Sequence, residues 1–248
     1  MATKNGNGKN GSLTLNIFRF DPDKDKEPRY QPYQVATRSG MSVLEGLFEV
    51  LDKQDPSLSF RYACRGAVCG SCAMYINGAY RLACQTQISR LETNQITVGP
   101  LPHLPLIKDL VVDMTPFFEK YERILPYLKT QSEMPEKERL QSPKQRKQIN
   151  DAVDCILCSC CYSACPMTWK DKNYLGPSAL NKAYRFVADS RDEATDERLK
   201  IVSSEDGVWR CHTIFNCVEA CPKSINQTEG IEGLRRKTVS QKVKIWKR

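Results

Sequence analysis

The residues with the clearest chemistry in this sequence are its cysteines. The chain contains 12 of them among 248 residues, and they fall into three groups. The middle group reads CILCSCCYSACP and places five cysteines between Cys155 and Cys165. Thiolates this closely spaced either pair as disulfides or bind metal, and one iron–sulfur cluster takes at most four of them. One of the five therefore has a different role.

Metal binding is the better interpretation of this cysteine content. Disulfide scaffolds belong mostly to short secreted chains with a signal peptide. The N-terminal stretch MATKNGNGKNGSLTL has no apolar core and no small-residue cleavage site, so we expect no secretory signal. No segment approaches the roughly 18 consecutive apolar residues of a transmembrane helix, and the mean hydropathy is -0.51. We therefore expect metal-bound thiolates in a reducing compartment.

The first group has the spacing C-x4-C-x2-C with a fourth cysteine eleven residues further on: Cys64, Cys69, Cys72 and Cys84. This is the spacing of a plant-type [2Fe–2S] site. Gly66 and Gly70 are expected to allow positive φ and a close approach of backbone amides to the sulfur atoms. A structural zinc site is the alternative, but zinc favours C-x2-C pairs.

The second group fits the bacterial two-cluster motif C-x2-C-x2-C-x3-C-P, whose fourth cysteine ligates the other cluster. The motif selects four cysteines and the proline after them: Cys155, Cys158, Cys161, Cys165 and Pro166. Cys160 is left outside this register, and we expect it to be a small buried thiol. A second copy, CHTIFNCVEACP, spans residues 211–222 and has Ile214 where the motif has a cysteine.

Exchange of the fourth cysteine between the two copies assigns every ligand. The first site then holds a [4Fe–4S] cluster through Cys155, Cys158, Cys161 and Cys221. The second site has only three thiolates: Cys165, Cys211 and Cys217. Since Ile214 cannot ligate iron, we expect a [3Fe–4S] cluster there, and the alternative is a [4Fe–4S] cluster whose fourth iron keeps water or another ligand.

Hydrophobic periodicity indicates how the chain positions these groups. Residues 13–20 and 30–37 are predicted strands, residues 42–55 a helix that begins with a capping box, and Asn77-Gly78 a hairpin turn. Residues 13–100 therefore predict a small β-rich domain with one long helix. We expect a disordered tail over 1–12, a first domain over 13–105 and a second over 106–248.

The second domain is expected to be mostly helical. Residues 98–107 are rich in proline and predict a linker. Residues 108–129 are expected to be helical with proline interruptions, residues 135–150 to be a charged and mostly helical segment, and residues 177–192 to form a helix. The basic C-terminus, 231–248, favours either an anionic membrane surface or a solvated tail.

The order of the three groups resembles the iron–sulfur subunits of succinate dehydrogenase and quinol:fumarate reductase. NYLGPSALNKAYRFVADSRD, between the second and third groups, is also similar to that family, and the resemblance covers nearly all of residues 13–235. It implies an α+β fold class. The N-terminal domain would be a β-grasp, plant-type ferredoxin-like domain, and the C-terminal domain an all-helical, bacterial-ferredoxin-like domain.

The resemblance also implies a function in electron transfer and a set of partners. Dicarboxylate chemistry would take place on a flavoprotein subunit with covalent FAD. Electrons would pass from FAD through [2Fe–2S], [4Fe–4S] and [3Fe–4S] to a quinone, or in the reverse direction in a quinol:fumarate reductase. The other partners would be membrane-anchor subunits, with or without haem. The chain would lie peripherally on the cytoplasmic face of a bacterial or archaeal inner membrane, or on the matrix face in a mitochondrion.

Four residues match quinone-site positions of that family: Pro166, Trp169, His212 and Ile214. Ubiquinone-using members often have a tryptophan pair where this chain has Trp169-Lys170, so the type of quinone stays open and menaquinone is included. Structural roles are the alternatives: Pro166 shaping the cluster loop, Trp169 anchoring an interface, and His212 shielding a cluster.

Other classes of protein fit the sequence less well. A free multi-cluster ferredoxin is usually short and acidic, whereas this chain has a net charge of +8. That charge also suggests a zinc-containing nucleic-acid-binding protein, but the cysteine spacing favours iron, and we expect no nucleic-acid partner. The iron–sulfur subunit of another flavin dehydrogenase stays open. The chain has no dinucleotide fingerprint and only two histidines, so we expect no catalytic residue on it.

Overall fold

The computed structural model describes residues 11–133 and 135–246. The chain divides into two compact units, Met1–Asp113 and Met114–Arg248. Residues 1–10, which make up most of the expected N-terminal tail, lie outside the described residues. The first unit is built on a sheet and the second on helices, so the predicted α+β class is confirmed.

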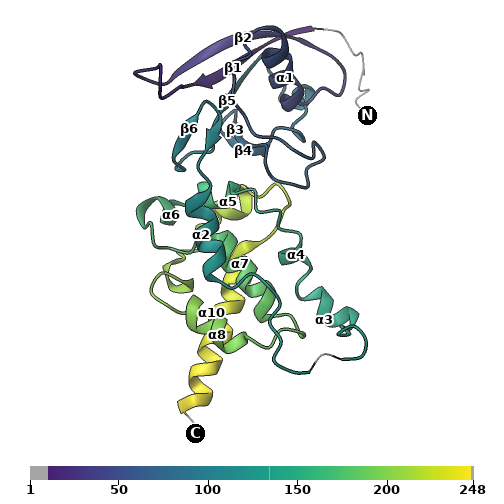
Figure 1. The fold of residues 1–248 in the computed structure, drawn as a ribbon, viewed down its shortest axis with the longest axis vertical. Helices are drawn as coiled ribbons and strands as arrows, with labels where there is room; N and C mark the ends of the chain where they lie inside the picture. The colour runs from purple at the N-terminus through teal and green to yellow at the C-terminus, as the bar shows by residue number, and fades with distance from the viewer. Residues whose placement is uncertain (1–10, 134, 247–248) are drawn as a thin grey trace, which may run out of the picture. The chain divides into compact units, whose positions relative to one another are not determined.

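A five-stranded mixed sheet forms the first unit (Figure 1). Its strands, in spatial order, are β2 (Arg29–Thr37), β1 (Gly11–Arg19), β5 (Gln95–Gly99), β3 (Ala73–Ile76) and β4 (Ala79–Leu82). The β1–β5 pair is parallel and the other neighbouring pairs are antiparallel. Leu13, Leu15 and Ile17 of β1 are buried, as the alternation in the sequence predicts. The strand begins at Gly11, two residues earlier than expected.

One helix, α1 (Val43–Lys53), packs its apolar face on this sheet. The predicted capping box is present, since the Ser42 hydroxyl accepts from the Glu45 amide and the Glu45 carboxylate accepts from the Ser42 amide. A Cβ at Gly46 would lie 2.9 Å from Leu15 Cδ1, so this glycine lets the helix approach the sheet closely. A sheet that holds one helix in this way is the expected β-grasp arrangement.

The hairpin and the proline-rich segment complete the first unit. Asn77 (φ 47°) and Gly78 (φ 76°) form the predicted turn between β3 and β4. The segment 98–107 is not a plain linker, because it contains the end of β5 and the start of β6 (Leu106–Lys108), which pairs with β7 (Val111–Val112). Buried Asp109, in the turn between β6 and β7, accepts a hydrogen bond from Arg19 Nε at 3.0 Å and fastens this hairpin to β1.

The second unit consists of helices and loops. Its α-helices are α2 (Thr115–Arg123), α3 (Pro143–Lys147), α4 (Asn150–Val153), α5 (Cys160–Ser163), α6 (Pro166–Lys170), α7 (Gly176–Val187), α8 (Thr195–Val202), α9 (Asn216–Glu219) and α10 (Gln227–Trp246). Short 3-10 turns are η1 (Ile88–Arg90) in the first unit and η2 (Val208–Arg210) in the second. The four-residue helices α5 and α9 directly follow the loops that begin at Cys155 and Cys211.

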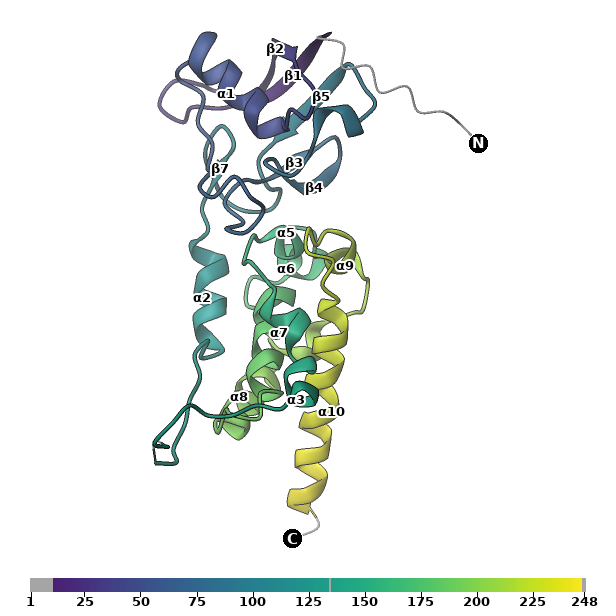
Figure 2. The ribbon, with the colours of Figure 1, turned by 90° about the vertical axis from the view of Figure 1, so that its right-hand side faces the viewer.

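Helices α7 and α10 lie side by side at the centre of the second core (Figure 2). Leu180 on α7 and Ile231 on α10 are fully buried there. A Cβ added at Gly233 would lie only 2.4 Å from the Tyr184 ring, so the absence of a side chain on α10 makes room for that ring. Close packing of these two helices fixes the first turns of both, which border the cysteine loops.

Two segments differ from the expected helices. Residues 108–129 contain β7 and then only α2, and residues 135–150 contain only α3 and the start of α4. The second of these segments buries no residue before Ile149, and Leu140 is 84% exposed, so little packing supports a longer helix. The basic C-terminus, in contrast, continues α10 as far as Trp246. Among the described residues, no helix has the length and apolar character to cross a bilayer.

Candidate metal centres

The first cysteine group surrounds a loop whose amides face sulfur. Cys64 Sγ accepts hydrogen bonds from the amides of Gly66, Val68 and Cys69 at 3.3, 3.4 and 3.3 Å. The Cys64 amide donates in turn to Cys69 Sγ at 3.4 Å. Amides directed at a thiolate stabilise its charge and that of a bound cluster. The loop between α1 and β3 thus has the form that the C-x4-C-x2-C spacing predicts.

The conformation of this loop differs in one detail from the expectation. Positive φ occurs at Arg65 (56°), Ala67 (57°) and Gly70 (74°) but not at Gly66. The prediction of positive φ was therefore wrong for Gly66, which contributes its amide to the sulfur instead. Residues with side chains adopt the left-handed conformation at a cost of roughly 1–3 kcal/mol each, and here the turn directs successive amides toward one thiol.

The thiols of this group have different affinities for protons. The Ser71 hydroxyl and neighbouring amides lower the pKa of Cys69 to about 6. Burial raises the pKa of Cys72 to about 12. A buried thiol gives up its proton when a bound metal ion compensates the negative charge of the thiolate. Cys72 is therefore suited to metal ligation and poorly suited to be a free thiolate.

The second and third groups have the same backbone conformation. In each copy, the third residue after the leading cysteine is flanked by two residues of positive φ and followed by a four-residue helix, α5 or α9. The flanking residues are Leu157 (55°) and Ser159 (65°) in the first copy and Thr213 (55°) and Phe215 (69°) in the second. Ile214 therefore has the backbone position in the second copy that Cys158 has in the first.

A first cavity brings together cysteines from both copies. Cys155, Cys158 and Cys161 line it from the first copy, and Cys221 lines it from the second. These are the four cysteines predicted to hold [4Fe–4S]. Cys160 is fully buried but does not line this cavity. A hydrogen bond to Cys158, together with burial, raises the pKa of Cys160 well above its usual value.

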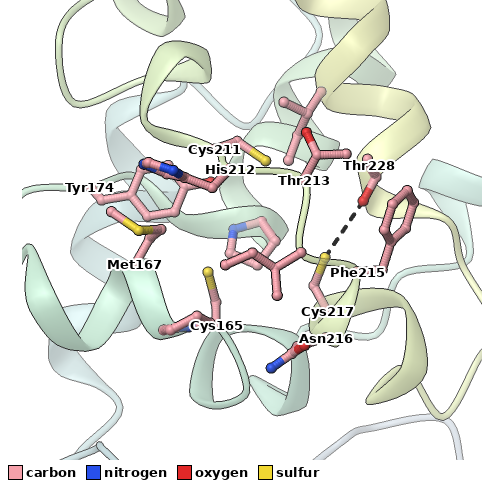
Figure 3. Close-up of a pocket in the computed structure, with 14 residues that line it drawn as sticks. Cys165, Met167, Tyr174, Cys211, His212, Thr213, Phe215, Asn216, Cys217 and Thr228 are labelled. Carbon is pink, nitrogen blue, oxygen red and sulfur yellow. Dashed lines mark hydrogen bonds between the residues drawn. The ribbon is translucent and has the colours of Figure 1, made fainter.

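A second cavity is lined by the remaining three predicted ligands. Cys165 from the first copy and Cys211 and Cys217 from the second line it, and Figure 3 shows their sulfur atoms directed into one space. Apolar side chains, among them Met167 and Tyr174, form much of the rest of the wall. Ile214 also lines this cavity and is 50% exposed.

The donor chemistry of both cavities fits iron–sulfur clusters. Cys161 and Cys217 are buried and the other five thiols are partly buried. Burial raises the pKa of Cys161 strongly and that of Cys217 to about 11. Neutral thiols tolerate such surroundings, while thiolates need the positive charge of bound iron. Within residues 11–133 and 135–246, no three Cys, His, Asp or Glu side chains are grouped to hold a single metal ion. The cysteines of these two runs line cavities instead.

Three of the four expected quinone-site residues lie together. Pro166, His212 and Ile214 line the second cavity, and the His212 side chain is exposed. Trp169 is not among its lining residues. The Trp169 indole N–H donates to the Ser163 carbonyl oxygen at 2.7 Å, which ties α6 to α5. This contact is a structural role for Trp169, and its place in the quinone site stays a prediction.

Two residues around the cavities could not be found from the sequence. Tyr174 is 1% exposed and lines the second cavity, and burial raises its pKa strongly. Arg235 on α10 donates to the carbonyl oxygens of Val208 and Cys211 and so fixes the loop that presents Cys211. Nothing in the local sequence of either residue indicates this role, because each reaches the cysteines through folding of distant segments.

Comparison with known families divides the chain in the same way. Residues 14–119 match the family described as a 2Fe-2S iron-sulfur cluster binding domain. Residues 147–222 match the family described as a 4Fe-4S dicluster domain. Cysteine groups one, two and three all fall inside these matches, so cluster binding is a property of both units.

Whole-chain relatives cover nearly the full length. The succinate dehydrogenase iron–sulfur subunit of Paracoccus denitrificans is 41% identical over 229 residues, covering 92% of this chain and 88% of the relative. The mitochondrial succinate dehydrogenase (ubiquinone) iron–sulfur subunit 1 of Oryza sativa subsp. japonica is 43% identical over 228 residues, covering 90% and 81%. A chain of the Mycobacterium smegmatis Sdh1 complex in the apo form superposes with a TM-score of 0.85 at 25% identity, over 95% of this chain and 98% of that one.

Proposed function

The chain belongs to the family of succinate dehydrogenase iron–sulfur subunits, and on that premise we propose which cluster each group of cysteines holds. Electron transfer within that enzyme is its function, and a partner flavoprotein carries the dicarboxylate chemistry. Cys64, Cys69, Cys72 and Cys84 hold [2Fe–2S]. The first cavity of the second unit holds [4Fe–4S], and the second cavity holds [3Fe–4S].

The observation that supports this assignment is the exchange of cysteines between the two cavities. Cys165 belongs to the first copy of the motif yet lines the second cavity, and Cys221 belongs to the second copy yet lines the first. Four thiols therefore surround one cavity and three surround the other. Ile214, at the backbone position of a fourth ligand, offers only a hydrocarbon side chain, which favours the three-iron form.

The chain's own residues prepare these sites for electron transfer. When bound, the clusters supply one-electron redox chemistry. The protein supplies thiolates, excludes water with apolar walls, and directs amides at sulfur, as at Cys64. These features lower the cost of moving charge inside the chain, because dipoles fixed by the fold need little rearrangement when an electron arrives.

We place the exit toward quinone beside the second cavity. His212 and Ile214 are both exposed there, so a quinone held by anchor subunits can approach the last three cysteines. The imidazole of His212 can pass a proton to a quinone carbonyl oxygen. Trp169 supports the position of α6 through Ser163. Attachment to the membrane is through the anchor subunits, on the cytoplasmic face in a bacterium or archaeon and on the matrix face in a mitochondrion.

The cluster assignment is tested on the intact complex by low-temperature EPR and iron analysis. Cys217→Ser should remove the three-iron signal of the oxidised protein and preserve the four-iron signal of the reduced protein. Cys155→Ser should do the reverse. If Cys217→Ser instead lost the four-iron signal and kept the three-iron signal, the two clusters would be assigned to the wrong cavities.

The quinone exit is tested by comparing two electron acceptors. His212→Ala should lower succinate:quinone turnover by up to ~10²-fold, the lower end for loss of a proton-transfer group. Reduction of an artificial dye that takes electrons at the flavin should stay near normal. Trp169→Phe keeps an aromatic ring, although a smaller one, and removes the N–H bonded to Ser163. Loss of both activities together in this variant would identify a structural residue. Equal loss of both activities in His212→Ala would show that this histidine does not act in the quinone site.

A further inference from the structure

Each cavity of the second unit is lined by a buried hydroxyl that lies near the start of α7 or α10 and next to a cysteine. Ser178 Oγ on α7 lies 3.9 Å from Cys155 Sγ at the first cavity. Thr228 Oγ1 on α10 lies 3.8 Å from Cys217 Sγ at the second cavity, where Figure 3 marks the contact with a dashed line. The two residues are 2% and 4% exposed. Both hydroxyls are therefore removed from water.

The positions of Ser178 and Thr228 in their helices make a cysteine sulfur the expected hydrogen-bond partner of each hydroxyl. In a helix interior, a serine or threonine hydroxyl can donate to the carbonyl four residues earlier. Ser178 is the third residue of α7 and Thr228 is the second residue of α10, so in both cases that earlier residue precedes the helix. A buried hydroxyl normally makes a hydrogen bond, and the cysteine sulfur lies within reach of each.

Ligation of iron fixes the direction of these hydrogen bonds. A free thiol can donate or accept, but an iron-bound cysteine has no proton and can only accept. Ser178 must then donate to Cys155, and Thr228 must donate to Cys217. A donor at a ligand sulfur stabilises the more negative, reduced state of the cluster, since hydrogen bonds to sulfur are among the factors that set cluster potentials.

We propose that Thr228 and Ser178 are positioning residues that raise the reduction potentials of the two clusters separately, Thr228 that of [3Fe–4S] and Ser178 that of [4Fe–4S]. The inference rests on the proposed cluster assignment. Because each hydroxyl lines one cavity only, each effect is confined to one cluster. The chain thereby sets the difference between two neighbouring potentials with residues that ligate neither cluster.

The test is a redox titration of the intact complex followed by EPR. Thr228→Val keeps the shape of the side chain and removes the donor, so the three-iron midpoint should fall while the four-iron midpoint stays constant. A tenfold change in the ratio of oxidised to reduced cluster is the expected size, which corresponds to ~59 mV for one electron. In Ser178→Ala, the four-iron midpoint should fall while the three-iron midpoint stays constant. Thr228→Ser, which keeps a hydroxyl, should restore the wild-type midpoint.

The possible results separate this inference from the cluster assignment. Unchanged midpoints in Thr228→Val and Ser178→Ala, with both signals present, would overturn the inference and leave the assignment standing. Absence of a three-iron signal in the wild type would overturn the assignment itself. If Thr228→Val does not assemble, Ser178→Ala tests the same chemistry at the other cavity, and an unchanged four-iron midpoint there counts against the proposal.

Discussion

Replacing Ile214 with cysteine should convert the proposed three-iron site into a four-iron site. Ile214 lines the cavity that contains Cys165, Cys211 and Cys217. Its flanking residues have positive φ values within 4° of those that flank Cys158, a predicted ligand of the four-iron site. A thiol introduced at this position thus starts from the backbone conformation of a ligand, and it can hold the fourth iron that a hydrocarbon cannot.

The structure predicts that this substitution perturbs folding little. Cysteine has two carbon-sized groups fewer than isoleucine, and Ile214 is 50% exposed. At about 0.8 kcal/mol per fully buried methylene, half burial of two such groups gives a loss of ~0.8 kcal/mol. That is small against the roughly 5–15 kcal/mol of a typical domain. A change in cluster type would therefore report ligation and not loss of structure.

The assay combines EPR of the oxidised complex with iron analysis. Ile214→Cys should lose part or all of the three-iron signal and gain iron, and electron delivery to quinone should slow because a four-iron cluster at this site would have a lower potential. Ile214→Ala is the matched control, since it loses slightly more packing and adds no ligand, and it should keep the three-iron signal. A full three-iron signal in Ile214→Cys, with unchanged iron content, would refute the claim that position 214 is the position of a fourth cluster ligand.

Three further predictions concern the second unit. Cys160→Ser should keep all three clusters in EPR, whereas Cys161→Ser should disrupt the [4Fe–4S] signal; loss of that signal in Cys160→Ser would mean that the motif register is wrong. Gly233→Ala would place a Cβ 2.4 Å from a ring carbon on α7, and overpacking of this kind should lower the free energy of unfolding by about 1–3 kcal/mol in chemical denaturation. Burial opposes ionisation of Asp189, but hydrogen bonds from Arg191 outweigh it and lower the pKa of Asp189. Because this folded-state pKa is depressed, the stabilisation is present above the unfolded value of about 3.9 and is lost as the pH falls through the lower folded value. Asp189→Asn should therefore be less stable near pH 7 and show a flatter loss of stability in acid, and an unchanged acid limb would rule this carboxylate out as a contributor.

Local features of the fold were predictable because short-range chemistry determines them. The capping box at Ser42 and Glu45 and the turn at Asn77-Gly78 each depend on a few neighbouring residues, and both predictions are confirmed. The expected helix over 135–150 was largely wrong for the opposite reason. Polar residues there satisfy helix propensity, but without a buried face the helix has too little packing to persist.

The membership in an electron-transfer family was also predictable, because metal ligands must occur at fixed spacings around a cluster. The spacing of the three cysteine groups alone indicated which thiols belong together, and the register left Cys160 out. The backbone conformations around Cys158 and Ile214 agree with that register. The assignment of each cluster to its cysteines stays a proposal until the spectra are measured.

The sequence shows which residues can bind a cluster, but it does not show which side chains surround them. The sequence by itself determined the types and spacings of the thiols, since a cluster imposes them over a few residues. Only the tertiary structure decided that Trp169 directs its N–H at Ser163 and that Thr228 and Ser178 lie beside cysteine sulfurs. Those contacts depend on how α7 and α10 pack, which is the summed result of many weak apolar contacts between distant segments and leaves no local pattern to read.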